Sequence, residues 1–550
     1  MATTTDSFYA ENEKGKGQWT ATVDKPAGEA WATEPNHLDD ENLQRGLKLR
    51  HISLISIGGI IGTGLFLGSG GALHNGGPLG LWLGYSIFGV ILGLGEMASY
   101  LPLAGGHLLY ASRFVDPALG FALSWTYSVM WLIVNPAELS AVAVLMNYWV
   151  KSTVVNNAVW IAIAMALVFI LNLFPASVYG ETEFIFSSIK VITIIGLIIC
   201  GIAINCGAGP HGKYIGFKYW KDPGPFAPKF ASLTGAKGQF LGFWAVLTQA
   251  AFSYLGSEVV AVTAAESKNP TRAIPRAIKQ VYLRICVFYI LGTFIIGLNC
   301  PSNEPRLGTT SDATASPFVI AISRAGIKVL PHIINGCLIS SAWSAANADI
   351  YIASRSIYTL ASQGWLPKVF LTTSKRGAPY VASITAGLSG LLAFMTVSNN
   401  ANKVFNWFVN LITVGGLMVY TIIAITYLRF RKGVEAQGID RSQMPFTSGF
   451  AKTGAWIAAC FIPLIIFFSG WEVFLHNGKK FDHATFITNY LPVVLVLGAY
   501  GGHKLYAKTK PVPISEMDLH TGARHKGDYT ETTSTEKLPI WERIGNLIGG

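Results

Sequence analysis

About twelve apolar stretches, each long enough to cross a bilayer, constrain this chain more than any other feature of its sequence. A helix needs about 20 apolar residues to span a bilayer, whereas a barrel strand needs only about 9 to 11. A segment in lipid must satisfy its backbone hydrogen bonds internally, so stretches of this length predict helices. The sequence therefore predicts an all-α membrane protein with twelve transmembrane helices, centred near Ile61, Ile91, Met130, Ala166, Leu197, Phe252, Leu291, Ser341, Leu388, Met418, Phe461 and Val496.

The composition also favours a membrane over water. Of the 550 residues, 51% are hydrophobic and only 13% are charged, whereas soluble proteins carry about 25% charged residues. The net charge of +11 would suggest a nucleic-acid partner in a soluble protein. In a membrane protein, however, Lys and Arg mostly anchor helix ends, so we expect no nucleic-acid partner. The six cysteines show neither C-x-x-C spacing nor a nearby His cluster, which predicts free thiols and no metal site.

Basic residues between the apolar stretches predict the orientation of the chain. An even number of spans places both tails on one side, and the basic loops assign that side to the cytoplasm. The loop from about Cys206 to Gln239 opposes this topology locally, because its five lysines would lie outside, but the other loops outweigh it. The supporting residues are Arg45, Lys48, Arg50, Lys268, Arg272, Arg276, Lys279, Arg429, Arg431 and Lys432.

The polar tails flank a single predicted transporter domain, residues 47–506. Residues 1–46 and 507–550 are rich in Thr, Ser, Glu and Lys, so neither tail has enough apolar surface to fold alone. Both tails are predicted to be mostly disordered, and the first lacks the apolar core of a signal peptide. Both tails are expected to be cytoplasmic, where their lysines are candidate sites for the ubiquitination machinery.

The first apolar stretch is unusually rich in glycine. Residues 56–66 read S-I-G-G-I-I-G-T-G-L-F, with four glycines within seven positions. Glycine at this density weakens a helix, but small residues also let transmembrane helices pack closely. Composition alone leaves both interpretations open.

A second weak stretch favours the broken-helix interpretation. About 190 residues further on, residues 251–258 read A-F-S-Y-L-G-S-E, again with glycine, hydroxyl groups and a charge. Paired interruptions in corresponding halves of a chain indicate a transporter built from inverted repeats.

Two broken helices suit an amino acid as substrate. The freed N–H groups and positive end of a half-helix hold a carboxylate, and freed carbonyls hold an ammonium group. Gly62, Thr63 and Gly64 suit the carboxylate, with the Thr63 hydroxyl as an added donor. Ser253 and Gly256 belong to the second break and are predicted to line the same site.

The two interruptions also carry a resemblance to a known family. The string G-G-I-I-G-T-G-L-F, the string F-S-Y-L-G-S-E, and E-S-K-N-P followed by I-P-R-A-I at 266–270 and 274–278 resemble the yeast amino acid transporter family of the amino acid-polyamine-organocation superfamily. The resemblance covers about residues 45–505. It implies the leucine-transporter fold, with inverted repeats of five helices at about 50–205 and 240–432 and two extra helices at about 453–506.

The resemblance further implies a set of site residues and a cargo. It places ammonium contacts at the carbonyls of Ile60, Phe252 and Leu255, and an aromatic gate at Phe252. It also implies proton-coupled uptake of amino acids across the plasma membrane, with no cofactor. The A-F-S-Y-L-G-S-E segment and the S-A-A-N stretch at 344–347 are most similar to the subgroup that carries acidic amino acids.

Ionisable residues inside a span are costly and are therefore functional hypotheses. Lys190 lies about two turns inside the fifth stretch, where it can either extend to the interface or take part in coupling. The resemblance favours coupling, because proton-coupled relatives carry a lysine there. Glu258 follows the second break and can relay a proton, pair with a cation or cap a half-helix. Glu138 is predicted to act in coupling or selectivity, and Glu96 in a structural ion pair.

Polar residues in the eighth and tenth stretches complete the candidates. Ser340, Ser344 and Asn347 share one helix face and lie close to Asp349, so they either line the site or join helices by hydrogen bonds. Thr413 is the preferred side-chain contact, because the resemblance links this part of the tenth helix to selectivity.

Other functional classes fit less well. An enzyme would need a catalytic constellation or a phosphate-binding loop, and the sequence shows neither. A channel would need a ring of carbonyls or charges. A broad-range, neutral or basic amino acid permease remains an alternative. So does a non-transporting amino acid sensor on the same scaffold, although tails of about forty to fifty residues are short for a sensor.

Overall fold

The computed structural model describes residues 51, 54–55, 61–91, 95–102, 105–210, 212–230, 233–259, 270–307, 316–374, 377–397, 401–474 and 481–523. These residues are almost entirely helical, as the sequence predicts. Their one sheet is an antiparallel pair of two-residue strands, β1 (Lys229–Phe230) and β2 (Leu233–Thr234). All six cysteines are free thiols.

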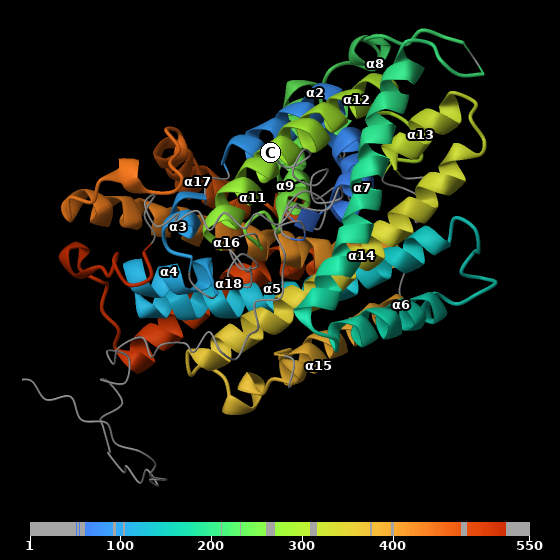
Figure 1. The fold of residues 1–550 in the computed structure, drawn as a ribbon. Helices are drawn as coiled ribbons and strands as arrows, with labels where there is room; N and C mark the ends of the chain where they lie inside the picture. Colours follow the sequence, from blue (N-terminus) through green and yellow to red (C-terminus); the bar gives the residue numbers. More distant parts are fainter. Residues whose placement is uncertain are drawn as a thin grey trace, which may run out of the picture. The chain divides into compact units, whose positions relative to one another are not determined.

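The helices follow the chain in the order shown in Figure 1. The α-helices are α2 (Ser69–Ile91), α3 (Gly95–Tyr100), α4 (His107–Phe114), α5 (Pro117–Met146), α6 (Asn157–Asn172), α7 (Ala176–Asn205), α8 (Lys218–Lys221), α9 (Gly235–Tyr254), α11 (Pro270–Arg284), α12 (Gly292–Asn299), α13 (Pro317–Arg324), α14 (Leu330–Ser362), α15 (Tyr380–Leu388), α16 (Ala401–Ala436), α17 (Ala451–Phe467) and α18 (His483–Ala507). The π-helices are η2 (Gly64–Gly68) and η4 (Ile285–Leu291), and the longer 3₁₀ segments are η6 (Lys368–Leu371), η7 (Ser389–Val397) and η9 (Trp471–Phe474).

Seven helices among the described residues are long and apolar enough to cross a membrane. They are Pro117–Met146, Ala176–Asn205, Ala277–Asn299, Tyr380–Val397, Lys403–Ala436, Ala451–Phe474 and His483–Ala507. All the predicted span centres except Ile61 lie in helical segments. The count of twelve spans and the inverted repeat stay predictions. The helix α14 has 33 residues, but its many Ser and Asn side chains and its buried Asp349 reduce its hydropathy.

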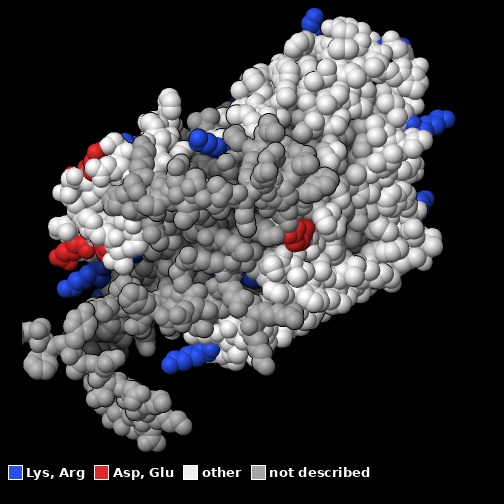
Figure 2. Space-filling view, in the orientation of Figure 1, with Lys and Arg blue, Asp and Glu red and all other residues white. Residues whose placement is uncertain are grey.

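The helix α7 buries its polar face and exposes its apolar face, as a helix in contact with lipid does. Its buried face carries Glu183, Ser187 and Lys190, whereas Ile192 and Ile199 on the opposite face are 70% and 61% exposed. A soluble protein would place these residues the other way round. On the face shown in Figure 2, the described surface in the region of α7 and α13 carries few charged side chains, and Lys and Arg lie mainly at its margins. The apolar outer surface is therefore suited to contact lipid tails.

The helix α5 forms the centre of the described fold. It packs against α14 on one side and against α16 on another, and α2 packs against α9 (Figure 1). The side chain of Asp116 caps α5 by accepting a hydrogen bond from the Ala118 backbone N–H at 2.9 Å, and Pro117 occupies the first helical position. These residue types explain why the helix begins at Pro117.

Residues 508–523, which we call the C-terminal strap, pack across one end of α4, α5 and α16. The backbone N–H of Val512 donates to the Val115 carbonyl at 2.9 Å, and the Gln437 side chain donates to the Met517 carbonyl at 2.7 Å. Leu519 is completely buried. Composition did not reveal this order, because the strap gains its apolar contacts from the helices rather than from itself.

An ion pair also fastens the strap. The Arg113 guanidinium lies 2.8 Å from the Asp518 carboxylate. Burial would raise the pKa of Asp518, but hydrogen bonds from Thr521 and the charge of Arg113 hold this pKa below its ordinary value. A lowered pKa stabilises the folded strap at neutral pH, and this contribution is lost as the pH falls through the lowered value.

We expect a Leu519→Ala substitution to lower the free energy of unfolding by about 2 to 5 kcal/mol, the usual cost of emptying a buried leucine site. The measurement is thermal denaturation of the detergent-solubilised protein. Leu505→Ala is the matched control, because Leu505 is 81% exposed. Equal stability of the two variants would show that the strap is not docked.

Candidate functional site

A cavity lies where the two interrupted segments meet. The centres of water molecules can occupy about 50 Å³ of this cavity. The cavity therefore has room for about three to five water molecules. Most of its wall is apolar, and the polar exceptions include Glu138, Ser253 and Asp349. The lining residues are Ile55, Gly62, Gly64, Leu65, Met130, Trp131, Val134, Glu138, Tyr179, Phe252, Ser253, Leu255, Val259, Ala345, Ala348, Asp349, Ile352 and Ile412.

The first interruption is confirmed at Ile61 and Gly62, which are not helical. The helix resumes at Thr63 and continues as the π-helix η2. Gly64 lies so close to the second interruption that a Cβ added to it would be 3.0 Å from the Ser253 Cα. Glycine therefore lets two backbones approach closely at the cavity wall.

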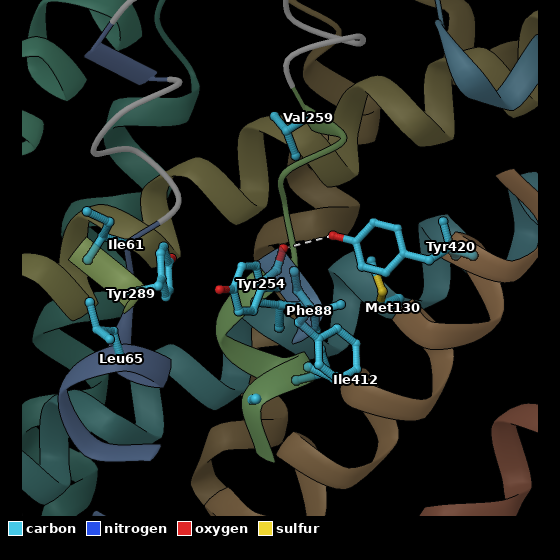
Figure 3. Close-up of a cluster of buried hydrophobic side chains, with 14 of the residues drawn as sticks. Ile61, Leu65, Phe88, Met130, Tyr254, Val259, Tyr289, Ile412 and Tyr420 are labelled. Atoms are coloured by element: carbon cyan, nitrogen blue, oxygen red, sulfur yellow. Dashed lines mark hydrogen bonds between the residues drawn. The ribbon is translucent and has the colours of Figure 1, made fainter. Parts of the chain in front are cut away.

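The second interruption is also confirmed, because α9 ends at Tyr254. Leu255 is extended, and Gly256 has a φ of +88°, a conformation that favours glycine. The Tyr420 hydroxyl on α16 donates to the freed Tyr254 carbonyl at 2.8 Å, the bond drawn in Figure 3. Side chains from another helix thus satisfy the backbone groups that the break exposes.

Glu138 on α5 faces the first interruption. Its Oε1 accepts hydrogen bonds from the Thr63 hydroxyl at 3.0 Å and from the Thr63 backbone N–H at 3.4 Å. Ser341 on α14 donates to the Ile61 carbonyl at 3.0 Å. The end of the broken segment is therefore held between α5 and α14, with one freed donor and one freed acceptor satisfied.

Lys190 on α7 is buried, but it does not line the cavity. Its Nζ lies 3.7 Å from Glu183 Oε1, and both side chains are fully buried. Glu183 also accepts hydrogen bonds from Ser187 at 3.0 Å and from Ser344 at 2.9 Å. Position alone did not decide between an interfacial and an interior Lys190, and the structure places it in the interior. Sequence reasoning missed Glu183, although its spacing of seven residues from Lys190 is the signal for a shared helix face.

Glu258 lies beside the second interruption without lining the cavity. Its Oε2 lies 2.7 Å from the Tyr420 hydroxyl oxygen. The same hydroxyl contacts the Tyr254 carbonyl, so Tyr420 links the carboxyl group to the broken backbone. Glu96 pairs with Arg441 at 2.8 Å and lies 3.6 Å from Arg431, as its predicted structural role requires.

The cavity brings six of the predicted site residues together. Gly62, Gly64, Phe252, Ser253, Leu255 and Glu138 line it. Thr63 contacts it through Glu138, and Ile60 lies outside the described residues. Gly256 is not part of the lining.

The polar residues of α14 and α16 are arranged differently from the sequence expectation. The Thr413 hydroxyl donates to the Val409 carbonyl of its own helix, and the neighbouring Ile412 lines the cavity instead. Ser344 binds Glu183, and Asn347 accepts a hydrogen bond from Asn172. Ser344 and Asn347 thus join helices, which was the open alternative. Of this polar group, Asp349 is the one that lines the cavity.

The site offers no evident metal centre. Among the described residues, no three His, Cys, Asp or Glu side chains are grouped closely enough to hold a metal ion. The chemistry available at the cavity is hydrogen bonding by backbone groups and carboxyl groups.

Comparisons with known proteins identify a family and several relatives. Residues 51–515 match the family model described as amino acid permease. A dicarboxylic amino acid permease of Saccharomyces cerevisiae is 41% identical over 520 residues, which cover 93% of this chain and 85% of that protein. A lysine-specific permease of the same yeast is 38% identical, with coverage of 93% and 84%. A solved transporter of the nucleobase-cation-symport-1 family superimposes with a TM-score of 0.45 and 15% identity, covering 84% of this chain and 94% of its own, which is too weak to establish a common fold.

We expect a Gly64→Ala substitution to lower the free energy of unfolding by about 1 to 3 kcal/mol, because the added methyl group would press on the backbone of Ser253. Thermal denaturation in detergent measures the effect. The matched control is Gly196→Ala on α7, where an added Cβ meets nothing within 4 Å. A Gly64→Ala protein as stable as the control would contradict the close approach of the two interruptions.

Proposed function

The chain belongs to the amino acid permease family, and we propose that it is a secondary active permease that takes up L-amino acids with protons by alternating access. The homologous family consists of transporters rather than enzymes, and the described helices fit an integral membrane protein. The observation that carries the proposal is the meeting of two interrupted helices at one cavity, because broken helices supply matched donors and acceptors for a zwitterion.

In this proposal, backbone groups bind the two charged ends of the substrate. The donors at Gly62, Thr63 and Gly64 hold the α-carboxylate, and the carbonyls of Ile60, Phe252 and Leu255 hold the ammonium group. Glu138 now accepts hydrogen bonds from both Thr63 donors. A substrate carboxylate at this position replaces Glu138, so binding displaces a charge of the same sign and moves the α5 side chain. Phe252 closes the cavity over the substrate as an aromatic gate.

We assign proton coupling to Lys190 together with Glu183. The two charged groups are 3.7 Å apart and fully buried, so the pair is neutral overall when both are ionised. Adding or removing one proton leaves an uncompensated charge in the interior, which is costly. The pair should therefore change its protonation state only when its surroundings change, as they do in a transport cycle. Glu258, through Tyr420, is the second group we expect to respond to substrate.

We propose acidic amino acids as the preferred cargo. The support is the similarity to the dicarboxylic permease, at 41% identity. A general amino acid permease of the same yeast is 40% identical over 524 residues, so broad-range uptake is the alternative. A sensor that binds amino acids without moving them is excluded only by a transport assay.

For the cell, we propose a plasma-membrane location with both termini in the cytoplasm. The basic loops support this orientation through the positive-inside rule. Membrane lipids then surround the apolar outer surface, and the tail lysines face the cytoplasmic ubiquitination machinery.

Uptake of labelled glutamate, lysine and leucine into permease-deficient yeast cells tests the proposal. We expect glutamate to accumulate against its gradient, with an initial rate at least about 10-fold higher at external pH 4.5 than at pH 7.5 if at least one proton enters per substrate. Absence of accumulation for every amino acid would overturn the transport function. Accumulation that ignores pH and protonophores would overturn proton coupling alone.

We expect Lys190→Ala to abolish accumulation against a gradient, because no ammonium group remains to exchange the proton. The single variant leaves Glu183 buried without its cation, which is costly to stability. The double variant Lys190→Ala with Glu183→Gln removes both charges and should recover stability without recovering accumulation. Lys151→Ala is the control, since Lys151 is exposed in the turn after α5. A Lys190→Ala protein that still concentrates substrate would remove Lys190 from the coupling step.

A further inference from the structure

Two carboxyl groups of the cavity have an oxygen without a hydrogen-bond partner. Glu138 Oε2 on α5 and Asp349 Oδ2 on α14 are both buried, and neither finds a partner among the described residues. The two side chains are only 4% and 3% exposed, and both line the cavity. Glu138 Oε1 is occupied by Thr63. Asp349 is therefore the carboxyl group of the wall that has no part in holding the broken helix.

The cations near Asp349 have other partners. Lys190 lies on α7 beside Glu183, which holds its charge. On the same helix as Asp349, the Arg355 guanidinium lies 3.6 Å from the centre of the Tyr351 ring. No Lys, Arg or His side chain lines the cavity among the described residues. An ionised Asp349 would thus add a second negative charge to a desolvated wall that already carries Glu138.

A neutral carboxyl group avoids this cost. Burying an isolated carboxylate is far more expensive than burying the protonated acid, and two carboxylates that share one site disfavour each other's charge. A neutral carboxylic acid gains an O–H donor that a carboxylate lacks. The buried neutral acid can therefore donate a strong hydrogen bond to a bound carboxylate.

We propose that Asp349 binds the side-chain carboxylate of an acidic amino acid as a neutral carboxylic acid, donating its O–H to the substrate. The proposal rests on the amino acid transport proposed above and names the residue that selects the side chain. Asp349 would be a specificity residue of the same cavity, and nothing in the sequence comparison assigns it this role.

The geometry of α14 supports this placement. An added Cβ at Gly62, where the α-carboxylate is expected, would lie 3.5 Å from the Ala345 Cβ. Asp349 follows Ala345 by four residues on the same helix face, about 6 Å along the axis. The two carboxyl carbons of an extended glutamate are about 5 Å apart, across four C–C bonds of about 1.5 Å. Ala345 and Ala348 are small, so the wall between the two positions leaves room for the substrate chain.

The same arrangement carries a proton with each acidic substrate, in addition to the proton that the Lys190–Glu183 pair exchanges. Asp349 takes a proton from the outer solution before or as the substrate binds. The hydrogen bond keeps that proton between Asp349 and the substrate carboxylate while the cavity is closed. When the cavity opens inward, the substrate and the proton leave to the inner solution, so the bound side chain and its proton cross as a neutral unit.

Other titratable groups face Asp349 and enter any pH profile. Glu138 on α5 and Glu183 and Lys190 on α7 interact with it electrostatically. On α7, Tyr179 stacks on Tyr351 of α14 with ring centres 3.9 Å apart. The effect of Asp349 on the pH profile must therefore be separated from the effect of the Lys190–Glu183 pair. A variant that keeps a hydrogen-bond donor at position 349 but cannot titrate makes this separation.

The variant that keeps the donor is Asp349→Asn, because an amide N–H replaces the acid O–H at nearly the same size. We expect it to bind glutamate within about 3-fold of the unchanged protein at pH 4.5. Between pH 4.5 and pH 7.5, its glutamate affinity should change by less than about 3-fold, whereas that of the unchanged protein should fall at least about 10-fold. Asp349→Ala should lose about 10-fold or more in glutamate affinity, the usual loss when a hydrogen bond to a charged group is removed. Its leucine affinity should stay within about 3-fold.

The assay is inhibition of labelled substrate uptake and binding to the detergent-solubilised protein, with Asp482→Asn as the matched control. Asp482 is exposed at the start of α18, and asparagine is also a good helix cap. Protein level and melting temperature show whether each variant folds, and binding by the purified protein replaces uptake for a variant that is poorly sorted. If Asp349→Asn abolishes glutamate binding, or if the unchanged protein takes lysine in preference to glutamate and loses it with Asp349→Asn, the proposal is overturned. If the unchanged protein binds no amino acid, the transport function fails instead.

Discussion

Unpaired backbone groups at the two helix breaks are the constraint on which the rest of this structure depends. A broken helix in an apolar environment exposes N–H and carbonyl groups that the helix itself no longer satisfies. Here Ser341, Tyr420 and Glu138 reach those groups from three different helices. Each of these hydrogen bonds fixes one long helix against a break, so α5, α14 and α16 are arranged around the cavity by the needs of the interrupted backbone.

The buried charged groups also hold helices in place. Glu183 has two hydroxyl donors and one ammonium partner, and one of those hydroxyls comes from α14. A buried ion pair gives little net stability, but it is costly to break by removing one partner. The pair therefore specifies how α7 meets α14 more than it stabilises the fold. Asp349, by contrast, has an oxygen that the protein leaves available to the cavity.

The sequence predicted the helical fold, the two breaks and part of the cavity wall, because these features follow from local patterns. Apolar length locates a span, and glycine density locates a weak point in it. It did not predict which polar side chains would reach the cavity. Ile412 faces the cavity, whereas the Thr413 hydroxyl bonds within its own helix. The face of α16 that lines the cavity is therefore one residue away from the predicted one. Glu183 was missed because its importance comes from Ser344 on α14, about 160 residues away, which no local pattern shows.

The order of residues 508–523 has a mechanical consequence. These residues hydrogen-bond to Val115 between α4 and α5 and to Gln437 just beyond α16. Thr509 also donates to Asp116, the cap of α5, at 2.8 Å. A cycle that pulled these helix ends apart would have to break several bonds at once, so we expect α4, α5 and α16 to behave as a fixed frame. We therefore expect movement in the broken segments, relative to a frame whose helix ends are held together by residues 508–523.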